Sequence, residues 1–190
     1  METEEYKNHT IEIYQDEIPE SPREWDNIGT MVCWHNRYLL GDEQPNIEPE
    51  RFFEDLGEEV FRLNLYLYDH SGITMNTSGF SCPWDSGQVG WIYVTKEQVR
   101  KEYDVKRISK KIRERVFKCL EAEVKTYDDY LTGNVYGYVV KDLNGEFVDG
   151  CSGYYGQEGV LEAISQAKSF IDYTYPVPYV EPFKLVPMFA

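Results

Sequence analysis

A long amphipathic helix predicted over residues 109–131 constrains the fold of this chain most strongly. Ser109 is a favourable N-cap, and Gly133 is the residue at which the helix is expected to end. The apolar side chains recur at helical spacing in one stripe, which consists of Ile112, Val116, Cys119, Leu120, Val124, Tyr127 and Leu131. Because only one stripe is apolar, the helix has to pack against a second layer and keep its other side in water.

Segments with strand-like patterns supply that second layer. Apolar and polar residues alternate over residues 61–67, which indicates a half-buried strand. The dipeptide Asn144-Gly145 is typical of a hairpin turn. The strands predicted from these patterns are 9–14, 29–34, 61–67, 91–94, 135–141 and 147–151.

Three shorter helices complete the pattern, at about 48–57, 95–103 and 158–172. The second of them begins with Thr95-Lys-Glu-Gln98, which matches a capping box. The order of elements predicts an α+β fold, with a mostly antiparallel sheet and about four helices packed on it. We expect a single domain over residues 1–175, followed by a Pro-rich apolar C-terminal tail over 176–190 that lies extended against the body or a partner.

Charge is the strongest functional signal. The net charge is −15, of which residues 1–95 contribute −14 and residues 119–190 contribute −7, while residues 96–118 carry +6. A field this negative repels phosphates, so direct DNA binding is not expected, and a basic protein is the expected partner. The alternative is that the charge serves only solubility.

The candidate partner-binding residues are acidic or aromatic. The acidic ones are Asp16, Glu17, Glu20, Asp42, Glu43, Glu48, Glu50, Glu54, Asp55, Glu58 and Glu59. The aromatic ones are Trp84, Tyr136 and Tyr138, since Trp and Tyr are frequent anchors in protein interfaces. The basic stretch 96–118 lacks interleaved aromatics for stacking on bases, and we interpret it as a solvated face that pairs with the acidic body.

Residues 60–95 hold the side chains that could carry chemistry. Cys33, His35, His70 and Cys82 are of the types that bind zinc, but they lack paired spacing, so no metal is expected. A nucleophilic site would combine Cys82 or Ser71 with His70 or His35 and an orienting carboxylate from Asp69, Asp85 or Asp26. Asp69 paired with Asp85 could instead hold a metal or perform acid–base chemistry. The structural alternative is a loop held by glycines and local hydrogen bonds.

The remaining sequence signals are negative. No run of apolar residues is long enough for a membrane span, and the N-terminal segment METEEYKNHT is unlike a signal peptide, so a cytoplasmic location is expected. The four cysteines are then expected to be reduced. No strand leads into a glycine-rich helix start, so no nucleotide cofactor is expected.

Three segments resemble a widespread family of small proteins of bacteriophages and mobile elements: SPREWDNIGTMVCWHNRY, LYLYDHSGITMNTSGFSCPWDSGQVGWIYV and YDDYLTGNVYGYVV. The resemblance covers about residues 20–155 and implies no catalytic residues. By analogy it implies an anti-defence inhibitor, such as an anti-CRISPR or antirestriction protein, some of which imitate DNA with carboxylates. The first hypothesis is therefore an inhibitor of a host nuclease, such as a CRISPR-Cas effector, or of another nucleic-acid-binding protein. The second is a small hydrolase that uses the 69–86 loop.

Overall fold

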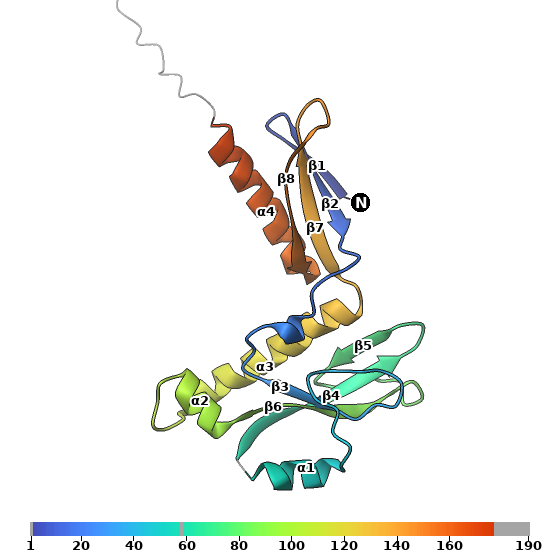
Figure 1. Ribbon diagram of the computed structural model, residues 1–190, viewed down its shortest axis with the longest axis vertical. Helices are drawn as coiled ribbons and strands as arrows, with labels where there is room; N and C mark the ends of the chain where they lie inside the picture. The colour runs from blue at the N-terminus through green and yellow to red at the C-terminus, as the bar shows by residue number, and fades with distance from the viewer. Residues whose placement is uncertain (1, 58, 177–190) are drawn as a thin grey trace, which may run out of the picture.

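The computed structural model describes residues 2–57 and 59–176 and confirms the α+β class (Figure 1). Its strands form two four-stranded sheets in which the named strands pair antiparallel. The first sheet has the order β1 (Glu2–Tyr6), β2 (His9–Gln15), β7 (Val135–Lys141), β8 (Phe147–Tyr155). The second sheet has the order β3 (Thr30–Cys33), β6 (Ser86–Thr95), β4 (Val60–Asp69), β5 (Ile73–Asn76).

The first sheet joins the two ends of the described chain. A hairpin that turns at Lys7-Asn8 forms β1 and β2, and β2 pairs with β7 of the hairpin whose turn runs from Asp142 to Gly145. Helix α4 (Gly156–Thr174) covers one face of this sheet (Figure 1). Their shared core includes the fully buried Ile11, Val140, Ala163, Ala167 and Ile171.

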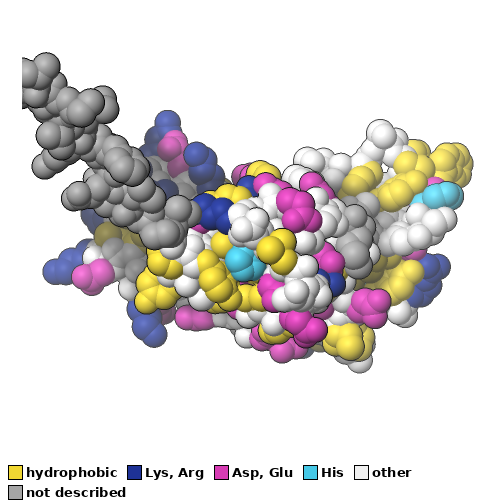
Figure 2. Space-filling model, turned by 90° about the horizontal axis from the view of Figure 1, so that it is seen from above, with side chains coloured by type: hydrophobic (Ala, Val, Ile, Leu, Met, Phe, Trp, Pro, Cys, Tyr) yellow, Lys and Arg dark blue, Asp and Glu magenta, His cyan; other side chains and the backbone are white. Residues whose placement is uncertain are grey.

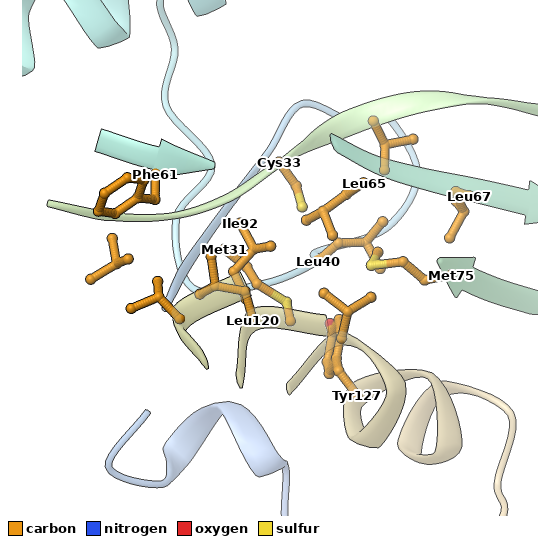
Figure 3. Packing of buried hydrophobic residues seen from close by; sticks show 14 of the residues in the cluster. Met31, Cys33, Leu40, Phe61, Leu65, Leu67, Met75, Ile92, Leu120 and Tyr127 are labelled. Carbon is orange, nitrogen blue, oxygen red and sulfur yellow. The ribbon is translucent and has the colours of Figure 1, made fainter. Parts of the chain in front are cut away.

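The second sheet lies between two helices. The predicted long helix, α3 (Lys110–Leu131), covers one face, and α1 (Pro49–Leu56) lies on the other (Figure 1). Figure 3 shows the core between α3 and the sheet, where Met31, Leu65 and Ile92 meet Leu120 and Tyr127. Helix α2 (Lys96–Glu102) continues directly from β6 through the predicted capping box at Thr95.

An ionic network ties the connection between the sheets to α3. The side chain of Arg23, in the short 3-10 helix η1 (Pro22–Glu24), is only 6% exposed. It donates to both carboxylate oxygens of Asp42, at 3.0 and 2.7 Å, to Glu123 on α3 at 3.2 Å and to the carbonyl oxygen of Gly29 at 2.6 Å. Glu123 in turn accepts hydrogen bonds from the backbone N–H groups of Ile28 and Gly29.

The strand and helix positions agree with the sequence patterns, but the division into two sheets was not predicted. β1 and β5 were also missed, and β6 begins at Ser86, five residues before the predicted strand. The expectation of a single domain over 1–175 stays a prediction. The expected docking of the tail falls almost entirely on residues 177–190, which lie outside the described residues.

Candidate functional site

Three segments that the sequence singled out meet at the end of the second sheet. They are the turn after β3, the end of β4 and the loop that leads into β6. The last two are joined by a hydrogen bond, in which the backbone N–H of Asp69 donates to the carbonyl oxygen of Asp85 at 2.8 Å. Between them lies an open hollow of about 370 Å³, lined in part by His35, Asp69, Trp84 and Asp85. Three of the candidate catalytic residues, His35, Asp69 and Asp85, therefore line one hollow.

Asp69 is held by two residues that the sequence reasoning missed. The guanidinium of Arg37 forms an ion pair with its Oδ2 atom, and the hydroxyl of Tyr38 donates to its Oδ1 atom at 3.2 Å. The ring of His35 stacks on Tyr38 and accepts backbone N–H groups of Arg37 and Tyr38 at its Nδ1 atom, at 3.3 and 3.1 Å. No spacing in the sequence signals these contacts, because the turn after β3 and the end of β4 are more than thirty residues apart. These contacts hold the turn in place, and they occupy Nδ1 of His35 and both carboxylate oxygens of Asp69, which a catalytic base would need to have free.

Asp85 lies between the candidate thiol and the candidate imidazole. Its Oδ2 atom is 3.5 Å from Sγ of Cys82 and 3.4 Å from Nδ1 of His70. A nucleophilic site needs the imidazole in contact with the nucleophile and the carboxylate behind the imidazole. Here the thiol of Cys82 contacts the carboxylate of Asp85, and the imidazole of His70 lies on the other side of that carboxylate. The arrangement therefore does not match that requirement. Of the other candidates, Ser71 and Asp26 are exposed and neither lines the hollow.

The zinc set does not assemble. Cys33 is fully buried in the core under α3, where burial raises the pKa of its thiol to about 12. Zinc needs deprotonated thiolates. Across the described part of the chain, no three His, Cys, Asp or Glu side chains are placed to hold a metal ion.

The aromatic candidates differ in exposure. The side chain of Trp84 is 91% exposed, as an anchor for a partner would be. The expectation for Tyr138 is wrong, because this residue is 2% exposed in the core of the first sheet and its hydroxyl donates to Asp149 at 2.9 Å. Tyr136 is partly buried against the same core. Because residues two apart on a strand share a face, Tyr136 and Tyr138 both face the core beneath α4.

The acidic candidates do not form one surface. The exposed residues Glu48, Glu50, Glu54 and Asp55 surround α1, and we call them the α1 acidic group. Asp16, Glu17 and Glu20 lie in the connection from β2 to η1, on the other side of the second sheet, and we call them the connector acidic group (Figure 1).

Four acidic candidates belong to neither group. The carboxylate of Asp42 binds Arg23 and the backbone N–H of Met31 within the molecule, and its contact with a partner stays a prediction. Glu59 pairs with Lys96 at 2.8 Å, and this hydrogen bond lowers the pKa of Glu59. Glu43 is exposed, whereas Glu58 lies outside the described residues.

Comparisons of the chain with family models, curated proteins and solved structures find no match. The resemblance to proteins of bacteriophages and mobile elements therefore stays a prediction. Among the described residues, no helix combines the length and the apolar character that crossing a membrane requires.

Proposed function

We propose that this chain is a non-catalytic inhibitor of the anti-defence type. It binds a basic host protein, a nuclease or another nucleic-acid-binding protein, through the α1 acidic group. The proposal is carried by the packing of α1 on aromatic side chains of the second sheet, which presents four exposed carboxylates from this short helix and its N-cap residue. The exposed Trp84 supplies a second contact of the kind that anchors protein interfaces.

This aromatic packing gives α1 a defined position. The ring of Phe52 packs edge-on against Trp34 at 5.7 Å between ring centroids, and the ring of Phe53 packs edge-on against Trp91 at 5.6 Å. The indole N–H of Trp34 also donates to the carbonyl oxygen of Ile47 at 2.6 Å, which fixes the segment entering the helix. A helix held in this way loses less conformational freedom when it binds, and this favours affinity.

Carboxylates at fixed positions can replace phosphates in a basic groove. Proteins hold DNA through Lys and Arg contacts whose strength comes largely from the release of counterions. The same Lys and Arg side chains attract carboxylates, and a chain of net charge −15 is drawn toward such a groove. The inhibitor would therefore compete with nucleic acid for the same surface.

Capture of partners from a bacterial lysate, followed by mass spectrometry, tests the proposal. The variant Glu50→Gln/Glu54→Gln removes two charges from the α1 acidic group, and Glu17→Gln/Glu20→Gln removes the same charge from the connector acidic group. We expect the first variant to bind a captured partner about ten- to a hundredfold more weakly and the second to bind as the wild type does. Equal binding by all three proteins would contradict the proposal.

A small hydrolase is the second candidate, because His35, Asp69 and Asp85 line one hollow with Cys82 close by. The direct contact of Cys82 with Asp85 supports the inhibitor over this alternative. Turnover of a p-nitrophenyl ester separates the two. Activity above the buffer rate that disappears in both Cys82→Ala and Asp85→Asn would favour the hydrolase, whereas activity that is absent, or unchanged in these variants, would count against it.

A further inference from the structure

A hollow lined by basic side chains lies at the opposite end of the second sheet from Trp84. It has a volume of about 520 Å³ and is formed by the start of β4, by α2 and by the segment that leads into α3. We call it the basic hollow, and its cationic residues are Lys96, Arg100, Lys106, Arg107, Lys110 and Arg113. Figure 2 shows Lys and Arg side chains gathered at the end of the molecule that carries α2 and the start of α3.

Few of these cations are neutralised within the described part of the protein. Lys96 pairs with Glu59 at 2.8 Å, and Lys110 is 3.9 Å from Glu114 in a pair whose side chains are both largely exposed. Arg100, Lys106 and Arg107 form no ion pair with a described residue. Among residues 2–57 and 59–176, the expected pairing of this segment with the acidic body is limited to the contact between Lys96 and Glu59.

The start of α3 adds to the positive potential. Ser109 caps the helix by accepting the backbone N–H of Ile112, and the first turn contains no acidic residue. It holds Lys110, Lys111 and Arg113 instead. Cations at the positive end of a helix destabilise it, whereas an anion bound there is stabilised by the same dipole. A bound anion would therefore offset the repulsion between these cations and the helix dipole.

The floor of the basic hollow is apolar. Phe61 and Ile108 line it, and the side chains of Lys96 and Arg113 lie over the ring of Phe61, each 5.8 Å from its centroid. Phe61 packs in turn on Phe117 of α3, which holds the floor in place. A ligand that fits this lining combines several negative charges with a flat or apolar part.

We propose that the basic hollow binds a nucleoside polyphosphate, with its phosphates on the cations and its base over the apolar floor. A compact ligand is favoured over a nucleic acid by charge. Residues 96–118 carry +6 within a chain of −15, so the rest of the chain carries −21. That field repels any polyanion that extends beyond the hollow. This site is independent of the α1 acidic group, so its test does not depend on the inhibitor proposal.

Calorimetric titration of the full chain with ATP, with inorganic tripolyphosphate and with a short single-stranded DNA tests the proposal. We expect ATP to bind more tightly than either of the other two ligands. Lys106→Ala/Arg107→Ala should weaken ATP binding at least tenfold. Arg115→Ala/Lys118→Ala removes the same charge outside the hollow and should change ATP binding less than threefold. Both variants should unfold at the wild-type temperature, since all four side chains are exposed.

Four results would overturn the proposal. The first is the absence of measurable ATP binding at ATP concentrations up to about 1 mM. The second is equal weakening by the two double variants, which would indicate non-specific attraction. The third is tripolyphosphate binding as tightly as ATP, which would show that the apolar floor is not used. The fourth is tighter binding of the DNA, which would make the hollow part of a nucleic-acid surface.

Discussion

At the scale of single residues, the most consequential side chain is one that sequence patterns did not identify. Arg23 is one of only five basic residues among the first 95, and its side chain is buried between Asp42 and Glu123. These partners come from the loop after β3 and from α3, so one guanidinium joins three segments that are remote in sequence. Asp42 and Glu123 also accept backbone N–H groups, so the network stabilises the connection as well as the charges.

Replacement of Arg23 by Ala should lower the free energy of unfolding by about 3–5 kcal/mol, because two carboxylates in a largely buried site would lose their cation. Chemical denaturation measures the change. Arg51→Ala is the control, since Arg51 forms an exposed pair with Asp55 and should change stability by less than about 0.5 kcal/mol. A similar small effect for both variants would show that the Arg23 network does not stabilise the fold.

The burial of the Cys33 thiol leads to a prediction about the stability of the protein at alkaline pH. Its pKa rises from 9.0 in an unfolded chain to about 12 in the folded protein because of burial. Unfolding above pH 9 then releases a proton, so the stabilising contribution is complete below pH 9 and is lost as the pH rises toward 12. The denaturant midpoint should fall over this range, and less steeply in Cys33→Ala than in the wild type. The exposed Cys151→Ala should keep the wild-type slope. Identical slopes in all three proteins would contradict the burial effect.

At the scale of elements, local signals located most helices and strands. The period of the apolar residues found α3 and β4, the capping box found α2, and Asn144-Gly145 found the hairpin of β7 and β8. Apart from the pairing of β7 with β8, the same signals say nothing about which strands pair. β1 was missed because its residues Glu2–Tyr6 are mostly acidic, and its register comes from a turn at Lys7-Asn8 with positive φ at both residues. A Lys in that conformation is uncommon and is not a recognisable turn signal.

The hairpin turn can be tested by one substitution. Gly145 has a φ of 82°, in the left-handed region where a side chain is strained. Gly145→Ala should therefore lower the free energy of unfolding by about 1 kcal/mol. Gly87→Ala is the matched control, because Gly87 does not have positive φ and its Cβ would meet no atom within 4 Å. Equal effects of the two substitutions on the denaturation midpoint would contradict this account of the turn.

At the scale of the whole molecule, the sequence predicted the sign of the charge but not its arrangement. The acidic residues predicted as one partner-binding set divide between α1 and the connector, because the chain crosses the second sheet between them. Asp69, Cys82 and Asp85 were predicted as a set of residue types, but the contacts of Asp69 with Arg37 and Tyr38 were not predicted, because those residues come from a distant turn. The basic hollow was visible in the sequence only as a charge run, because its shape requires Phe61 from β4 beneath α2 and α3.

The salt dependence of a captured complex tests the central claim most directly. The dissociation constant of the wild-type complex should rise steeply between about 50 and 200 mM salt, and added DNA should displace the inhibitor. Glu50→Gln/Glu54→Gln should flatten this dependence, while Glu17→Gln/Glu20→Gln should leave it unchanged. A dissociation constant that is insensitive to salt, a complex that DNA does not displace, or equal slopes in the two variants would contradict binding through the carboxylates of α1.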